Sequence, residues 1–96
     1  TLEALRAVPG PLVLGIQLDD GPLEPEPDLV EATLHAREVP GQGAFDLPGI
    51  VRALRDTGTM APVGVEVFSD ALHALRPEDA ARVAAEATRE TLRKAR

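Results

Sequence analysis

Two apolar runs of strand length stand out along the chain, separated by polar and turn-forming stretches. The first is PLVLGIQL at residues 11–18, and the second is APVGVEVF at residues 61–68. Apolar runs of this length, bounded by turn-forming residues, predict strands that are buried on both faces, as in parallel sheets. A loop rich in Pro, Asp and Glu follows the first run.

Apolar residues recur at helical spacing elsewhere in the chain. A helix is predicted over about residues 47–57, with Asp46 as its N-cap and Gly58 as its C-terminal stop. The stretch 29–38 could hold a short helix that the following Pro and Gly residues stop. A longer helix begins at Pro77, with acidic residues in its first turn and basic residues in its last, as the helix dipole favours. A stripe of small residues suits this helix to close packing on a sheet: Ala81, Ala84, Thr88 and Leu92.

Strands that alternate with helices predict parallel pairing in an α/β fold. Two parallel strands do not form a sheet with both faces covered, so neighbouring strands must come from elsewhere. A doubly wound domain or a (β/α)8 barrel of about 250 residues would supply them. The opening TLEALRAVPG reads like the last turns of a helix already under way. We therefore expect the chain to be a segment of such a fold, or to assemble with other copies of itself.

The composition narrows the functions that the chain can serve. Its 96 residues suffice for one small domain, and the net charge of -6 with 2% aromatic residues disfavours nucleic acid as a partner. Because the chain has no cysteine, any metal site must use oxygen or imidazole ligands, which favours hard divalent ions. No apolar run approaches the length of a membrane span and no signal peptide is recognisable, so we expect a cytoplasmic protein without a membrane partner.

Each predicted strand carries one polar residue near its C-terminal end. Gln17 follows Gly15 by two positions, and Glu66 follows Gly64 by two positions. Period-two geometry places each polar side chain on the face of its glycine, where a barrel interior meets the rim that holds active sites. A carboxylate buried there needs a cation or hydrogen bonds, so a shared metal ion would satisfy both residues. The alternative is structural: Glu66 pairs with an arginine and Gln17 bonds to the backbone.

The stretch HAREVPGQGAFDL at residues 35–47 is a candidate binding loop. Arg37 stands beside a glycine-rich turn and suits a carboxylate or phosphate, because its planar guanidinium donates two parallel hydrogen bonds. Taken alone, an exposed arginine usually faces solvent, and Gly-x-Gly is a weak signal. Asp19 and Asp20 precede a glycine and are typical of a turn, and of the two only Asp20 is kept as a further candidate. His73 is interpreted as a surface histidine.

The strand ending IQLDD, the loop HAREVPGQGAFDL, the helix ALRDTG and the strand VGVEVFSD together resemble the C-terminal part of the xylose isomerase-like TIM barrels, the sugar phosphate isomerase and epimerase superfamily. The resemblance covers nearly the whole chain and implies that residues 1–96 are the last two of eight strand–helix units. It also implies parallel strands with an active site at their carboxyl ends. The structural partner would then be the remainder of the barrel or another copy of the chain.

The resemblance implies one divalent cation, typically manganese, magnesium or cobalt, with zinc as a further option. Glu66 matches the eighth-strand glutamate ligand of the superfamily, and Gln17 stands where a seventh-strand histidine is usual. The 3-dehydroshikimate dehydratase branch resembles this chain in having glutamine as that ligand and a His-x-Arg-x-x-Pro-Gly-Gln-Gly loop. The residues that fit the loop, and would by resemblance bind substrate, include His35, Arg37, Gly41 and Gly43. A glutamate and an aspartate from strands five and six would complete the ligand set, upstream of Thr1.

These features support three hypotheses. The first is a divalent-metal-dependent sugar or sugar phosphate isomerase or epimerase that acts on a small polyhydroxy or keto substrate, with Glu66 as both metal ligand and catalytic acid–base group. The second is a metal-dependent lyase of the 3-dehydroshikimate dehydratase type, which Gln17 and the histidine–arginine loop favour. The third is a non-catalytic fragment or module. With half a ligand set, the 96 residues alone are expected to be inactive.

Overall fold

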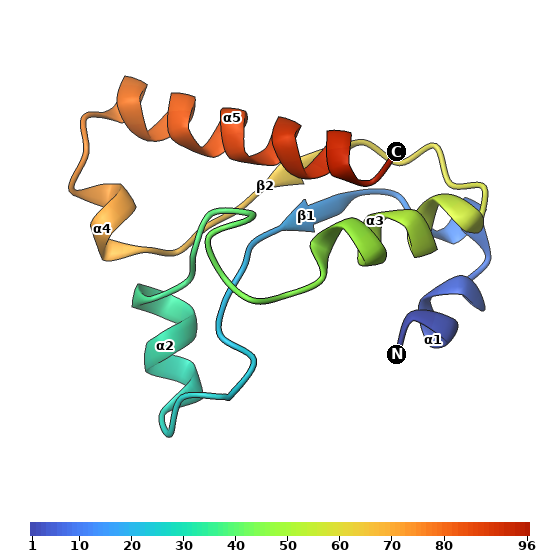
Figure 1. Ribbon diagram of the computed structural model, residues 1–96, viewed down its shortest axis with the longest axis horizontal. Helices are drawn as coiled ribbons and strands as arrows, with labels where there is room; N and C mark the ends of the chain where they lie inside the picture. Colours follow the sequence, from blue (N-terminus) through green and yellow to red (C-terminus); the bar gives the residue numbers. More distant parts are fainter.

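The computed structural model describes all 96 residues, Thr1 to Arg96. Its central feature is a short two-stranded sheet, with helices on one side of it and at both of its ends (Figure 1). The elements, in chain order, are α1 (Leu2–Arg6), a 3-10 helix (Gly10–Leu12), β1 (Ile16–Leu18), α2 (Leu29–His35), α3 (Leu47–Asp56), β2 (Val63–Val65), α4 (Asp70–His73) and α5 (Pro77–Lys94).

Strands β1 and β2 are parallel, which confirms the α/β class expected from the order of elements. Gln17 pairs with Gly64 and Leu18 pairs with Val65. Both strands are shorter than the apolar runs that predicted them. The first run loses its start to the 3-10 helix, because Pro11 has no N–H to donate to a ladder and suits a helical turn instead.

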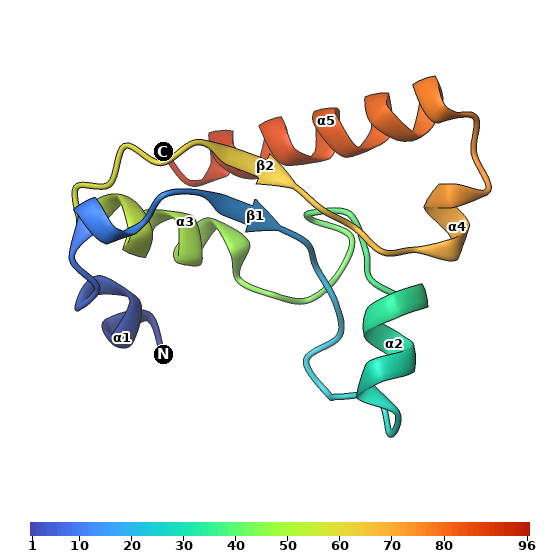
Figure 2. The same ribbon diagram turned by 180° about the vertical axis from the view of Figure 1, so that it is seen from behind.

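Helices α3 and α5 cover one face of the sheet. The core cluster joins Leu18 of β1, Val51 of α3 and Ala95 at the end of α5. Ile16 and Val63 pack against it from the strands. Figures 1 and 2 show the two helices running beside the strands, while the segments that follow β1 and β2 extend together from one end of the sheet, toward α2 and α4.

Three helix ends lie where the sequence predicts them: the start and the end of α3 and the start of α5. The Asp46 side chain accepts a hydrogen bond from Gly49 N–H at the start of α3, and Gly58 has φ 76° just beyond its end. Helix α5 begins at Pro77, as predicted. Helix α4 was not predicted; its N-cap is Ser69, whose hydroxyl accepts a hydrogen bond from Leu72 N–H at 3.2 Å.

The expected small-residue stripe of α5 is partly wrong. Ala84 and Thr88 are buried and Leu92 packs against the core cluster, but Ala81 is exposed. Ala81 lies near the start of α5, beyond the reach of the short sheet, and Thr91 near the end of the helix is buried in addition to Ala84 and Thr88.

The second face of the sheet has no covering helix. Only 14 of the 96 residues are buried, so one small core on the α3 and α5 side accounts for most of the packing. Large apolar side chains stay exposed near the strands, including Leu14 at 83% and Met60 at 95% of their accessible surface. None of the helices is both long enough and apolar enough to cross a membrane.

Candidate active site

Gln17 and Glu66 lie on the face of the sheet that no helix covers. The register pairs Gln17 with Gly64, and Glu66 follows Gly64 by two positions in the extended segment that continues β2. Both side chains therefore project from one face of the sheet. A hydrogen bond from Glu66 N–H to Leu18 O, at 3.1 Å, continues the parallel ladder beyond β2. Strand spacing puts the two Cα atoms roughly 8 Å apart, within reach of one shared ligand for two long side chains.

Both polar side chains are free within the chain. Gln17 and Glu66 are exposed, and neither forms a side-chain hydrogen bond or ion pair with another residue of the 96. Glu66 is therefore not paired with an arginine here, which was the structural alternative for this position. The amide oxygen and the carboxylate together offer oxygen donors of the kind that hard divalent cations accept.

Arg37 is held by Asp19, which directly follows β1. The guanidinium donates from Nε to Oδ2 of Asp19 at 2.8 Å and from Nη2 to Oδ1 at 3.2 Å. Its carbon Cζ lies 5.5 Å from the centre of the Phe45 ring, a cation–π distance. Both partners of the ion pair are partly buried, at 24% exposure for Arg37 and 30% for Asp19. The pair is thus shielded from solvent more than any other arginine–carboxylate pair of the chain.

Asp20 organises the candidate binding loop from the inside. Its side chain is 1% exposed and accepts three backbone N–H groups: Oδ1 from Gly21 at 2.8 Å and from Phe45 at 3.0 Å, and Oδ2 from Gly41 at 2.9 Å. A buried carboxylate that is fully hydrogen-bonded in this way compensates the cost of its desolvation. Asp20 therefore fixes the glycine-rich turn against the end of β1, which is more than a turn residue does.

The two glycines predicted to contact substrate have structural roles in this turn. Gly41 has φ 89°, a conformation that side-chain-bearing residues rarely adopt. A Cβ at Gly43 would collide with Oδ1 of Asp20 and come within 2.5 Å of Gly21 N and 2.6 Å of Gly21 O. The absence of side chains is thus required for the loop to close on Asp20. Contact between these glycines and a substrate stays a prediction.

His35 links the two segments that follow the strands. Its Nδ1 lies 3.0 Å from Oδ1 of Asp70 in α4, and its Nε2 lies 3.9 Å from Oε1 of Glu31. The hydrogen bond to Asp70, then the negative charges of Asp70 and Glu31, raise the pKa of His35 above its ordinary value of 6.5. The backbone adds to this link, because Arg37 N–H donates to Phe68 O at 2.9 Å. Binding of substrate by His35 stays a prediction.

The raised pKa of His35 predicts a pH-dependent contact between these segments. The imidazolium–Asp70 pair contributes stability that is fully present below pH 6.5, and this contribution is lost as the pH rises through the raised pKa of the folded state. The variant Asp70→Asn should bring the pKa of His35 down toward its ordinary value, as measured by NMR titration of the imidazole ring. Asp79→Asn, which removes an aspartate paired with Arg82 instead, is the matched control. An unchanged His35 titration in Asp70→Asn would contradict the assigned cause.

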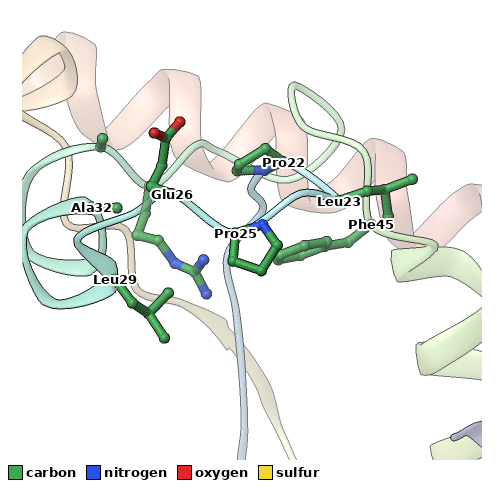
Figure 3. Close-up of a pocket in the computed structure, with 9 residues that line it drawn as sticks. Pro22, Leu23, Pro25, Glu26, Leu29, Ala32 and Phe45 are labelled. Carbon is green, nitrogen blue, oxygen red and sulfur yellow. The ribbon is translucent and has the colours of Figure 1, made fainter.

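A cavity of about 190 Å³ lies beside Arg37 (Figure 3). Its walls are mostly apolar, with charge supplied by Arg37 and Glu26. Figure 3 shows the Phe45 ring beside Pro25, with Leu29 and Ala32 of α2 on the other side. A ligand in this space would meet the Arg37 guanidinium, the Glu26 carboxylate and otherwise mostly apolar carbon.

Four residues of this region were missed or undervalued by sequence reasoning. Asp19, Asp20, Phe45 and Asp70 each contact a predicted site residue or its loop. The Asp-Asp-Gly sequence is ordinary in a turn, and turn preference does not distinguish its two acids. The signal that could have separated them is alternation, because Asp20 falls on the Leu18 side of the strand and Asp19 on the Gln17 side.

The parallel pairing and the polar residues at the carboxyl ends of both strands are those of a parallel α/β fold, in which active sites gather at that edge of the sheet. No family model matches the chain. The IolI protein, in a crystal structure with a bound zinc atom, superposes with a TM-score of 0.84 and 28% identity over 100% of this chain and 34% of its own. A xylose isomerase-like TIM barrel/4-hydroxyphenylpyruvate dioxygenase fusion protein superposes with a TM-score of 0.78 and 29% identity over 90% of this chain and 14% of its own.

Two curated proteins match by sequence, and both are named 3-dehydroshikimate dehydratase. The one from Pseudomonas putida is 34% identical, and the one from Pseudomonas aeruginosa 37%, over 72 residues in each case. The matches cover 75% of this chain and 11% of each relative, so the chain spans about a tenth of their length. The structural neighbours show that the fold of the chain is that of part of a TIM barrel, and both comparisons match the xylose isomerase-like superfamily that the sequence resembles.

Proposed function

We propose that the complete protein is a divalent-metal-dependent enzyme and that this chain supplies two of its metal ligands, Gln17 and Glu66. The observation that carries the proposal is their placement: two unpaired oxygen-bearing side chains on one uncovered face, at the carboxyl ends of adjacent parallel strands. Carboxylate and amide oxygens suit manganese, magnesium or cobalt, and zinc also accepts carboxylate oxygen. The zinc atom bound in the IolI structure supports the presence of a divalent ion in a protein of this fold.

The two ligands of this chain form half of a site. Within the 96 residues no three His, Cys, Asp or Glu side chains come together to hold a metal ion. We propose that β1 and β2 are the seventh and eighth strands of the barrel, so that residues 1–96 form its C-terminal segment. A glutamate and an aspartate on the two preceding strands would complete the set.

The reaction that we favour is the elimination of water from a hydroxylated ring carboxylate of the 3-dehydroshikimate kind. Sequence reasoning placed an isomerase or epimerase first; the two relatives named 3-dehydroshikimate dehydratase support the lyase instead. Gln17 supports it as well, because glutamine rather than histidine is the ligand that resembles that branch. Elimination of water from this substrate, followed by tautomerisation of its ketone, gives an aromatic dihydroxybenzoate.

The residues of the chain divide the chemical work among them. A bound divalent cation would act as a Lewis acid toward a substrate carbonyl oxygen. The carboxylate of Glu66 can accept or return a proton at the neighbouring carbon, since it has no partner in the chain to compete for its oxygens. The guanidinium of Arg37 keeps Nη1 free of its pair with Asp19 and can donate to a substrate carboxylate.

An isomerase or epimerase acting on a sugar or sugar phosphate is the second candidate. The observation that favours it is the free carboxylate of Glu66 on the open face, since proton removal and return at one carbon also achieves isomerisation. The fusion protein that superposes on this chain is itself described as xylose isomerase-like. The two reactions share their first proton transfer and differ in whether a hydroxyl group leaves.

The experiment that tests the proposal uses the complete protein, stripped of metal with a chelator and reloaded with manganese, magnesium, cobalt or zinc. We expect turnover only in the reloaded samples. With 3-dehydroshikimate, an ultraviolet absorbance of the aromatic product supports the lyase; interconversion of ketose sugars or their phosphates supports the isomerase. An absence of bound divalent metal, with no turnover of either substrate class after reloading, would overturn both and leave the non-catalytic hypothesis.

A further inference from the structure

We propose that Asp19 is a positioning residue that holds the Arg37 guanidinium at the edge of the Gln17–Glu66 face, with one side of the guanidinium left to bind a substrate anion. This inference rests on the function proposed above. It adds a residue that the resemblance to the superfamily does not supply, and it gives Arg37 a defined orientation.

Asp19 stands on the same face as the proposed metal ligands. Leu18 pairs with Val65, so the next position along the ladder sets Asp19 opposite Glu66, and the hydrogen bond from Glu66 N–H to Leu18 O extends the ladder to that point. The alternation of burial along the strand agrees with this placement. Leu18 and Asp20 are buried, whereas Gln17 is exposed and Asp19 is partly exposed. Asp19 is therefore a neighbour of Glu66 across the strands.

Asp19 is nevertheless unsuited to bind the metal itself. Oδ2 and Oδ1 both accept hydrogen bonds from the Arg37 guanidinium, so the carboxylate is engaged on each of its oxygens. Glu66 has no such partner. Two adjacent acids on one face thus have different roles: one is free to bind a cation, and the other carries an arginine.

The guanidinium is fixed on two sides: Asp19 holds the edge formed by Nε and Nη2, and the Phe45 ring covers a face at 5.5 Å. The backbone of Arg37 is also anchored, because its N–H donates to Phe68 O. Nη1 takes no part in these contacts and lies beside Gly21, where an added Cβ would come within 3.0 Å of it. A preorganised donor of this kind loses little freedom when an anion binds, which is how a fixed arginine gains affinity.

The test compares Asp19→Ala with Arg37→Ala and the double variant in the complete protein, with 3-dehydroshikimate as substrate. Because Asp19 acts through Arg37, we expect Asp19→Ala to lower kcat/KM by about ten- to a hundredfold, mainly through KM. The double variant should be no worse than Arg37→Ala alone. Manganese affinity should stay at the wild-type value in all three, since neither residue is a ligand.

The matched control is Asp56→Ala, which removes another aspartate–arginine pair. Asp56 bonds to Nε of Arg6 at 2.9 Å, between α3 and α1 and away from the strand ends. This variant should keep the wild-type kcat/KM. A second readout follows the Arg37 Nε–H resonance by NMR, which should be protected from exchange in the wild type and in Asp56→Ala, and exposed in Asp19→Ala and in Asp19→Asn.

The outcomes separate the inference from the proposed function. A wild-type protein with no metal-dependent turnover overturns the function and the role of Asp19 with it. If the wild type is active and kcat/KM of Asp19→Ala lies within twofold of that of Asp56→Ala, the inference alone is overturned. The same holds if the losses of transition-state stabilisation in the two single variants simply add in the double variant. If Asp19→Ala lost both kcat/KM and manganese binding, Asp19 would shape the metal site rather than position Arg37. That result would also overturn the inference.

Discussion

Glu66→Gln is expected to lower the turnover of the complete protein by about a thousandfold or more and to weaken its binding of divalent metal. The substitution keeps the size of the side chain but removes its charge, so the cation loses an anionic ligand and the substrate loses a proton acceptor. Glu66 lies free on the uncovered face beside Gln17, so no other residue of the chain replaces it in either role. Metal content by mass spectrometry and kcat after reloading with manganese measure the two effects separately.

Two variants define the scale of this result. Glu3→Gln makes the same change in the first turn of α1, away from the strand ends, and should leave kcat and metal content unchanged. Gln17→Glu adds a negative charge at the other proposed ligand and should retain the metal. Should Glu66→Gln bind manganese with wild-type affinity and keep a tenth or more of the wild-type kcat, Glu66 is neither a ligand nor the acid–base group.

The second large effect is expected in stability. Asp20→Ala leaves one buried and two partly buried backbone N–H groups without their acceptor and should lower the free energy of unfolding by about 3 to 5 kcal/mol. Asp20→Asn should fall between this variant and the wild type, because an amide offers one acceptor oxygen where the carboxylate offers two. Urea unfolding measures the loss of unfolding free energy. Hydrogen exchange at the amides of Gly41 and Phe45 shows whether the glycine-rich loop has opened.

Asp28→Ala is the matched control for this loss. The Asp28 side chain is exposed and caps α2 through one hydrogen bond from Glu31 N–H, at 3.0 Å. Its removal should cost about 1 kcal/mol. Equal losses in Asp20→Ala and Asp28→Ala would mean that the three bonds to Asp20 contribute no more than an ordinary helix cap.

The sequence alone predicts those parts of the molecule that depend on local spacing. The cap at Asp46, the stop at Gly58 and the start at Pro77 follow from the preferences of single residues, and all three are confirmed. The common face of Gln17 and Glu66 follows from the period of a strand and from parallel pairing.

Contacts between distant residues escape such reasoning. Asp20 accepts hydrogen bonds from residues 21 and 25 positions further along the chain, and Arg37 pairs with an aspartate 18 positions before it. No periodicity relates these positions; only the return of the loop to the strand end does. The first and last residues of the strands are not predictable for a similar reason. The length of a strand depends on the neighbouring strands and helices, which a single apolar run does not describe.

The hydrogen bonds at Asp20 also decide which part of the chain is free to vary. Asp20 N–H donates to Glu38 O at 2.8 Å and Glu38 N–H donates back to Asp20 O at 3.1 Å, so the excursion from Pro22 to Leu34 leaves and rejoins the end of β1 at one point. Lengthening a surface excursion of this kind adds little closure entropy. Insertions and deletions there would therefore change the surface above the strand ends and leave Arg37, Gln17 and Glu66 in place, so in the proposed enzyme this excursion is where substrate preference can change.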